Sequence, residues 1–214
     1  MDIEIRPARP DDASLLAWVM LMAGRSHLQR GIWDILIGRP EEECLTFLGY
    51  LAVSDEVHMC HYTGFIVAEV DGRPVAALSG YDPVMLPQAT VGAAMAAVMD
   101  KMGLTAEDMS TGQKGLAAFL TCHPEPYEGA WIVESVAARP ESRRQGIISR
   151  LLKEILEVGR QRGFRLAQVS FQIGNTPAQL AYEKAGFRFF DEKRHPDFQA
   201  EIGCPGIARL LRDL

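Results

Sequence analysis

The chain has 214 residues, 48% of them apolar. This is enough for one substantial core but too little for two comfortable domains, so we predict a single domain over residues 1–214. Its 22 basic and 28 acidic residues give a formal net charge of −6, which argues against partners such as nucleic acid or an anionic membrane. The first twelve residues lack the basic and apolar regions of a signal peptide, and every hydrophobic run is too short to span a bilayer. A cytoplasmic protein is therefore expected.

The cysteines, at positions 44, 60, 122 and 204, are scattered and form no C-x-x-C pair. This spacing predicts free thiols rather than a disulfide framework or a cysteine-rich zinc site. His58, Cys60 and His61 lie close together, but no second ligand pair follows at a spacing typical of zinc sites. We therefore expect no metal.

The first eighty residues predict two helices and three strands. Residues 3–9 alternate apolar and polar side chains, and Asp11 or Asp12 then offers a helix start before an apolar run. Pro40 and three glutamates begin a second helix. Further on, the Asp-Gly pair at residues 71–72 separates two short apolar runs, which is typical of a hairpin.

Residues 83–129 are rich in alanine and methionine and predict a helical insertion. Apolar side chains recur at helical spacing at Val91, Met95, Val98 and Met102. Thr105 is a plausible N-cap for a second helix. The methionine stripe predicts core packing, with a methionine-lined binding groove as the alternative.

From Trp131 the pattern becomes strand, helix, strand, helix, strand. The segments are 131–138, 146–163, 166–173, 176–186 and 187–194. Such alternation predicts parallel neighbouring strands, with ligands at their carboxyl ends. The final residues, 206–214, fit either a short helix or an edge strand.

The stretch "PESRRQGIISRLLKEIL" favours an anion site. Apolar residues at 147, 148, 151, 152 and 155 line one helical face, so the helix begins near Gly146. The first N–H groups of a helix lack intrahelical partners and carry partial positive charge, to which Arg139, Arg143 and Arg144 add. A phosphate or pyrophosphate fits there. An arginine-rich solvated turn is the alternative.

This stretch, followed by "GNTPAQLAYEKAGF", resembles the GNAT superfamily of N-acetyltransferases over about the last 85 residues. The resemblance implies an α/β (α+β) fold with a mixed, mostly antiparallel sheet that splays after the fourth strand. Helices flank this sheet, and the helical insertion precedes that strand. The G-x-x-x-x-G-K-[ST] pattern of P-loop proteins does not occur in the chain.

The resemblance also implies acetyl-coenzyme A as co-substrate and supplies roles for particular residues. A bulge in the strand 131–138 leaves the N–H groups of Val136 and Ala138 to face the pantetheine and the thioester oxygen, and the Asn175 amide bonds the pantetheine. Thr176 is the expected N-cap of the helix that follows, with Pro177 at its first position. The pyrophosphate cradle comprises Arg143, Arg144, Gln145, Gly146, Ile147 and Ile148. At Ile148 the family prefers a small residue.

By the same resemblance, Tyr182 gives a proton to the departing thiolate; packing beneath the cofactor is the other interpretation. A primary amine must lose a proton before it can attack a thioester. Glu134 is the first candidate for the proton acceptor because it is the only carboxylate in its strand. The next strand offers Gln168 and Ser170 instead of a carboxylate. A substrate anchor or solvated carboxylate is the alternative role of Glu134. The alternatives are a water relay to Glu134, or a base from the insertion such as His123, Glu125 or Glu128.

We therefore expect an acyltransferase that moves an acetyl group from acetyl-coenzyme A to a primary amine by direct attack, without a metal. A non-catalytic acyl-coenzyme A sensor is the alternative. The acceptor amine stays open, and a homodimer is possible given the apolar insertion. Acceptor choice is assigned to the first two helices and to the insertion, with Phe119, Tyr127 and Trp131 as expected pocket residues.

Overall fold

The computed structural model describes residues 3–87, 89–105, 107–108 and 110–214. Within these residues seven strands form one sheet in the order β1-β2-β3-β4-β5-β7-β6. The strands are β1 (Ile3–Pro7), β2 (Phe65–Val70), β3 (Arg73–Tyr81), β4 (Ala130–Ala138), β5 (Leu166–Gln172), β6 (Arg188–Arg194) and β7 (Gly206–Asp213). The helices are α1 (Ala13–Arg25), α2 (Ile32–Ile37), α3 (Glu41–Ala52), α4 (Ala89–Met102), α5 (Ser110–Cys122), α6 (Ile147–Gln161), α7 (Thr176–Lys184) and α8 (Pro196–Ile202).

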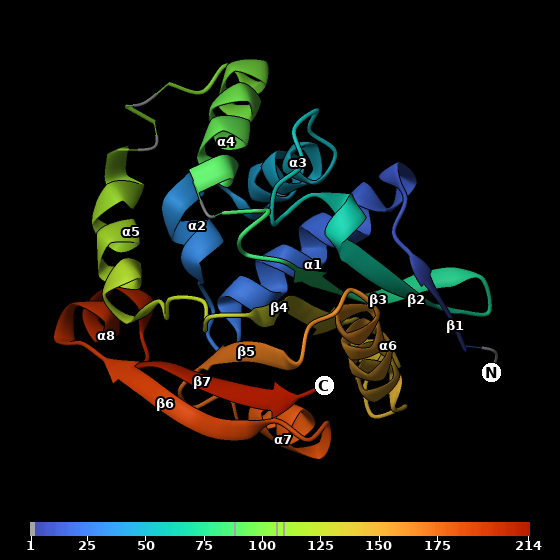
Figure 1. Cartoon of the computed structure of the whole chain (residues 1–214). Coiled ribbons are helices and arrows are strands. Elements are labelled where there is room, and N and C mark those ends of the chain that lie inside the picture. The colour runs from blue at the N-terminus through green and yellow to red at the C-terminus, as the bar shows by residue number, and fades with distance from the viewer. Residues whose placement is uncertain (1–2, 88, 106, 109) are drawn as a thin grey trace.

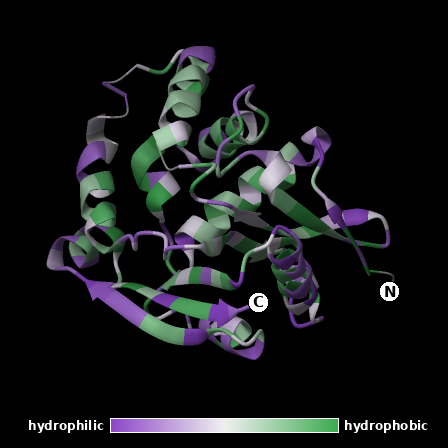
Figure 2. Cartoon of the chain, viewed as in Figure 1, coloured by the Kyte–Doolittle hydropathy of each residue, from purple (hydrophilic) through white to green (hydrophobic). Residues whose placement is uncertain are grey.

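Helices cover both faces of the sheet and bury two apolar cores (Figure 1). Side chains alternate across a strand, so Phe65 and Val67 of β2 pack with α1, α3 and α4, while Ile66 and Ala68 pack with α6. The edge strand β6 is mostly hydrophilic, as its purple colour shows (Figure 2). None of the described helices is long and apolar enough to cross a membrane.

The predicted hairpin is confirmed, since β2 and β3 pair in antiparallel register across Asp71 and Gly72. Both turn residues have left-handed backbones, with φ of 48° and 75°. Such turns match the natural twist of two antiparallel strands. The Asp-Gly pair therefore encodes this connection locally.

The sheet splays after β4, as the family resemblance implied. Strands β4 and β5 run parallel, and their register extends from Ala130↔Leu166 to Val133↔Val169. Both strands continue beyond this point. A bulge on β4 accompanies the separation: Ala77 of β3 pairs with Ala137, yet Ser79 pairs with Glu134, and Ser135 has a φ of 51°.

The prediction of parallel neighbours is wrong beyond β4 and β5. Strand β7 lies between β5 and β6 and is antiparallel to both. Residues 206–214 therefore form neither a short helix nor an edge strand, because hydrogen bonds join β7 to strands on either side. An apolar run of strand length carries no local mark of the neighbours with which it pairs.

Two short helices were not predicted. Gly31 N donates to Asp34 Oδ2 at 2.9 Å at the start of α2, and His195 caps α8. The two expected helices of the insertion are present as α4 and α5. Thr105 exchanges hydrogen bonds with Asp108 in a turn, and α5 runs from Ser110, so Thr105 is not its N-cap; Ala106 and Met109 lie outside the described residues.

The two helices of the insertion stand apart on separate supports (Figure 1). Helix α4 packs on α3, whereas α5 packs on α2 and α8. Two glycines let α5 approach α2 closely: a Cβ on Gly112 would lie 2.5 Å from Leu36 O, and one on Gly115 would lie 2.1 Å from Ile35 Cγ2. The insertion therefore forms two arms rather than one helical hairpin.

Candidate active site

A cavity of about 1760 Å³ opens where β4 and β5 separate. Its walls come from the end of α1, from α2, α4 and α5, from the second half of β4 and the end of β5, from the start of α6, and from α7 along most of its length. Ten of the eleven predicted site residues line it: Glu134, Val136, Ala138, Arg143, Arg144, Gly146, Ile147, Ile148, Asn175 and Tyr182. The predicted Gln145 does not, since its exposed side chain donates to Glu141 O at 3.1 Å.

The predicted cradle lies at the N-terminus of α6. Gly146 is the N-cap and has a φ of 77°, and Arg144 has a φ of 62°. The first intrahelical bond is donated by Arg150 N to Gly146 O, so the N–H groups of the first turn precede the helical ladder. A Cβ on Gly146 would meet no atom within 4 Å, which leaves space for an anion to approach the backbone.

The free edge of β4 lies beside this cradle. N–H groups along an antiparallel strand point alternately to its two edges. Arg139 N donates to Val75 O of β3 at 2.8 Å, so the N–H of the preceding Ala138 points away from β3, toward the splayed side. Val136 lies within the bulge on the same stretch. Arg143 Nε donates to Ala138 O at 3.3 Å and ties the cradle to this edge.

Glu134 is half-buried on the cavity wall at the point of splay. Burial raises the pKa of its carboxyl group to about 7, and a hydrogen bond from Tyr81 opposes the rise. A carboxylate with this pKa can accept a proton near neutral pH and release it again. Its position and protonation equilibrium both suit a general base.

Tyr182 holds its proton firmly. Burial raises the pKa of its hydroxyl above 10, and the charge of Glu134 adds to the rise. Its ring lies 6.3 Å from Phe171 and 6.2 Å from Phe187 between ring centroids. The cavity therefore brings together a proton acceptor and a protonated donor that act on each other electrostatically.

Asn175 differs from its predicted arrangement. It is itself the N-cap of α7: its Oδ1 accepts from Ala178 N at 3.2 Å, so Thr176 is not the cap and Pro177 is the second helical residue. Asparagine exceeds threonine as an N-cap, which explains the earlier cap. Its Nδ2 donates to Ser26 Oγ at 2.6 Å, so the amide is engaged rather than free.

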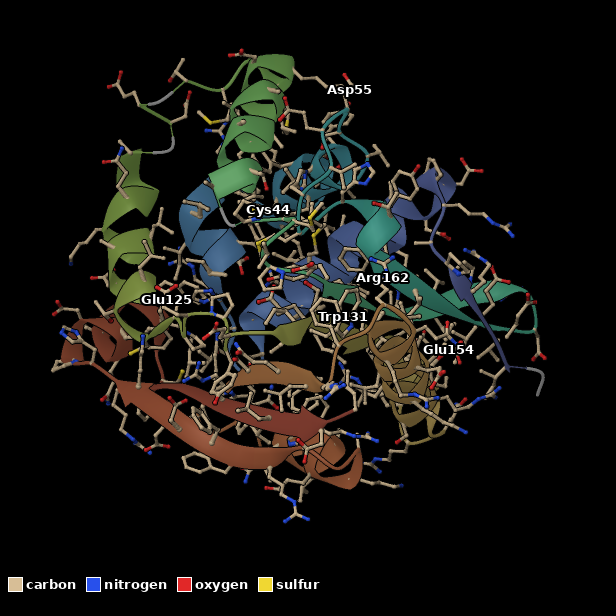
Figure 3. The ribbon with its side chains drawn as sticks, in the orientation of Figure 1. Cys44, Asp55, Glu125, Trp131, Glu154 and Arg162 are labelled. Atoms are coloured by element: carbon tan, nitrogen blue, oxygen red, sulfur yellow. The ribbon has the colours of Figure 1, made fainter. Side chains whose placement is uncertain are left out.

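Among the alternative bases, only His123 lines the cavity, and burial lowers its pKa. Glu125 and Glu128 are exposed outside it, and Glu125 lies beside the foot of α5 (Figure 3). Buried Gln168 accepts from Tyr127 N at 2.7 Å through Oε1. Glu134 is thus the carboxylate that the cavity presents.

Of the three expected acceptor-pocket residues, Phe119 lines the cavity, whereas Tyr127 and Trp131 do not. Trp131 is buried on the α6 side of the sheet, near Arg162 (Figure 3). Gly80 and Gly159 make room for its ring, because a Cβ on either would lie within 3 Å of it. Strand alternation directs Trp131 to the face opposite Glu134 and Ile132.

Some residues in or beside the cavity escaped prediction. Burial raises the pKa of the Cys60 thiol, and the charge of nearby Glu134 adds to the rise. Ser26 touches Asn175. Tyr81, at the end of the predicted hairpin, hydrogen-bonds Glu134. The sequence marks the segments that carry these residues, but it contains no motif that would bring them together.

The fold is shared with solved acetyltransferase structures. One described only as an acetyltransferase is 20% identical, with a TM-score of 0.72 and 98% of each chain covered. An N-acetyltransferase from Staphylococcus aureus Mu50 is 19% identical, with a TM-score of 0.69 over 97% of this chain and 99% of that one. The PaiA N-acetyltransferase from Thermoplasma acidophilum, in complex with coenzyme A, is 14% identical, with a TM-score of 0.55 and 100% of each chain covered.

No curated protein matches the chain in sequence. The model of the acetyltransferase (GNAT) family does match, over residues 30–187. This match includes β4, the α6 cradle, β5 and α7, and covers well over half of the chain. The chain therefore belongs to the acetyltransferase (GNAT) family.

Proposed function

We propose that this protein is an N-acetyltransferase that moves an acetyl group from acetyl-coenzyme A to a primary amine by direct attack. The observation that carries the proposal is the placement of Glu134, with a pKa of about 7, and Tyr182, with its raised pKa, in one cavity at the splay of β4 and β5. A solved relative of the same fold, the PaiA N-acetyltransferase, is described in complex with coenzyme A. This supports coenzyme A use here.

The cradle fits a pyrophosphate. Arg143, Arg144 and the first-turn N–H groups of α6 would hold its charge, and the open space at Gly146 allows close approach. The N–H groups of Val136 and Ala138 would hold the pantetheine arm and the thioester oxygen. Donors aimed at an oxyanion contribute about 3 kcal/mol each to transition-state stabilisation. Ile148, which stands where the family prefers a small residue, also lines the cavity. The proposal includes cofactor binding with this larger side chain in the cradle.

Acetyl-coenzyme A supplies a thioester carbon that an amine can attack. A primary amine has a pKa of about 10 and is protonated at neutral pH. Glu134 accepts the proton that the amine must lose. As the N–C bond forms and the C–S bond breaks, Tyr182 donates its proton to the sulfur. Because an alkyl thiol titrates near about 8.5, this second transfer assists the reaction without being indispensable.

The first test is calorimetric titration of the protein with acetyl-coenzyme A, with coenzyme A and 3′-dephospho-coenzyme A beside it. A thiol-release screen over primary amines follows. Micromolar binding together with release for one class of amines supports the proposal. Binding without release for any amine supports the sensor instead, and the absence of binding overturns both.

The other expectations concern location and assembly. A cytoplasmic location stays a prediction from the N-terminal pattern and the short hydrophobic runs. The absence of nucleic-acid and membrane partners stays a prediction from the net charge of −6, and the homodimer one from the apolar insertion. Cell fractionation tests the first. Light scattering at several concentrations tests the homodimer.

A further inference from the structure

The cavity extends well beyond the α6 cradle. Pockets for drug-sized molecules measure about 300–1,000 Å³, whereas this cavity has about 1760 Å³ and continues from the α6 cradle to the two arms. We call its far part the arm chamber. Its apolar lining residues are Ile32, Trp33 and Leu36 of α2, Val91, Met95, Ala96 and Met99 of α4, and Leu116, Phe119 and Leu120 of α5.

The scarcity of carboxylates around the cavity argues against a polycationic ligand. Among the described residues that line it, Glu134 is the only carboxylate. Arg25 also lines it, but its guanidinium is bound to Asp34 at 2.6 Å and to Glu41 at 2.7 Å. An acceptor with several ammonium groups would find one counter-charge here and would leave its other charges desolvated.

Three described residues on the exposed side of the arm chamber carry no polar side chain. Gly92 and Ala96 of α4 and Leu120 of α5 are all exposed and all line the cavity, so they mark its opening. Leu120 is 47% exposed. A peptide passing between the arms would meet no side-chain hydrogen-bonding group on these three residues. Unpaired peptide groups are costly to desolvate.

We propose that the acceptor is a small primary amine carried on an extended apolar body, such as an alkyl or arylalkyl amine. Its nitrogen lies at Glu134, and its apolar body lies in the arm chamber between α4 and α5. This inference rests on the proposed function and specifies the substrate class. Methionine suits such a chamber, because its unbranched, polarizable side chain adapts to irregular apolar shapes.

The experiment is a thiol-release assay with acetyl-coenzyme A and a graded set of amines. The set comprises n-alkylamines from butylamine to decylamine, phenethylamine, spermidine and an unblocked tripeptide. We expect kcat/KM to rise about fourfold for each added methylene until the chamber is filled, because burial of each group is favourable by a roughly constant amount. Spermidine and the tripeptide should be the poorest acceptors.

The outcomes separate the two proposals. Release that is fastest with spermidine or the tripeptide, or that does not depend on chain length, overturns the apolar-amine inference but leaves the N-acetyltransferase standing. Absence of release with every amine, despite cofactor binding, overturns the proposed function instead. Each result therefore bears on one named claim.

Two variants locate the effect in the arm chamber. A Cβ on Gly92 meets nothing within 4 Å, so the backbone accepts a side chain there. Gly92→Phe should narrow the opening of the chamber and shift the preference toward shorter amines, with Gly92→Ala as the size control. Leu120→Gln should lower kcat/KM for octylamine about tenfold, and by more than for butylamine, whose shorter chain makes less contact with the chamber. Phe189→Gln is the matched control, since Phe189 is 62% exposed but lies outside the cavity. Equal effects of the two glutamine substitutions overturn the assignment.

Discussion

The two ends of the cavity are built from different chemistry. At the α6 end, backbone N–H groups, Arg143 and Arg144 meet at a left-handed glycine. At the other end, methionine, leucine and tryptophan side chains of α2, α4 and α5 form the wall. Glu134 also lines this cavity, on the part of β4 where β4 separates from β5.

This difference separates a binding site whose geometry is fixed by the backbone from one whose side chains can be exchanged. The α6 end uses main-chain groups, whose positions follow from helix geometry and from one glycine backbone. The arm chamber uses side chains on α2, α4 and α5, which lie outside the sheet, so their composition can change without altering the sheet. We infer that the first end serves the co-substrate and the second serves acceptor choice.

The largest expected effect tests the α6 end. Gly146→Asp places a carboxylate beside the N–H groups that receive the anion, and it also forces an aspartate to a φ of 77°. We expect cofactor affinity to fall by at least about a thousandfold, since the added carboxylate repels the pyrophosphate and fills the space through which it approaches the N–H groups. Calorimetry with coenzyme A measures the loss.

A matched control separates backbone strain from electrostatics. Gly163 follows the same helix, has a φ of 92° and, like Gly146, leaves open space where a Cβ would lie. Gly163→Asp should cost similar stability and leave coenzyme A affinity unchanged. If a folded Gly146→Asp protein bound coenzyme A as tightly as the Gly163→Asp protein, the cradle would be misassigned.

The next effect tests Glu134 as the base. Glu134→Gln keeps the shape of the side chain and removes the proton acceptor, so we expect kcat to fall about a thousandfold. In the parent protein kcat should rise with pH through about 7, where the Glu134 carboxyl ionises. A pH–rate profile of the variant should lose this limb. If the variant's profile still rose through about pH 7, another group would be the base, and His123 is the first alternative.

The same carboxyl predicts a pH-dependent stability. Its pKa is about 7 in the folded chain against 4.5 for the free group, so the folded state binds the proton more tightly. The stability that this provides is complete below pH 4.5 and is lost as pH rises through 7. Glu134→Gln should therefore stabilise the protein at pH 8 by up to about 3 kcal/mol and have little effect at pH 4. Urea unfolding at both pH values checks the sign.

Tyr182 should matter less than Glu134. Removing its hydroxyl in Tyr182→Phe takes away the proton for the departing thiolate, which leaves tolerably well unaided, so we expect kcat to fall about tenfold. Stability should change little because the ring still packs against Phe171 and Phe187. Acetyl-coenzyme A affinity distinguishes the roles: a change in Kd without a change in kcat would make Tyr182 a packing residue.

The contrast between the two ends also explains what the sequence could predict. The cradle follows from short-range spacing, whereas the bulged strand and Tyr182 come from the family resemblance; the structure places all three around one cavity. The interior position of β7 and the α4 and α5 arms depend on contacts between distant segments, which local patterns do not record. Trp131 illustrates the limit, because a bulky aromatic suggested a pocket residue although Gly80 and Gly159 accommodate it behind the sheet.

Asn175 lies between the two cases. Its position was predicted, yet its partners were not, since Ser26 comes from a loop 149 residues away in the chain. The sequence predicted an amide free for the pantetheine, whereas the structure has it joining the α1–α2 loop to α7. The smallest expected effect decides between these roles.

Ser26→Ala removes the hydroxyl that accepts from Asn175 Nδ2 and keeps the cap on Ala178 N. If the amide serves to join the two segments, we expect a loss of about 1 kcal/mol in the free energy of unfolding and a change in acetyl-coenzyme A affinity below about threefold. Ser26→Gly, which suits the φ of 58° at this position, should regain part of that stability without restoring the bond. Tighter cofactor binding in both variants would instead mean that Ser26 competes for an amide that belongs to the co-substrate, and Asn175 would then join the α6 end of the cavity rather than connect its two ends.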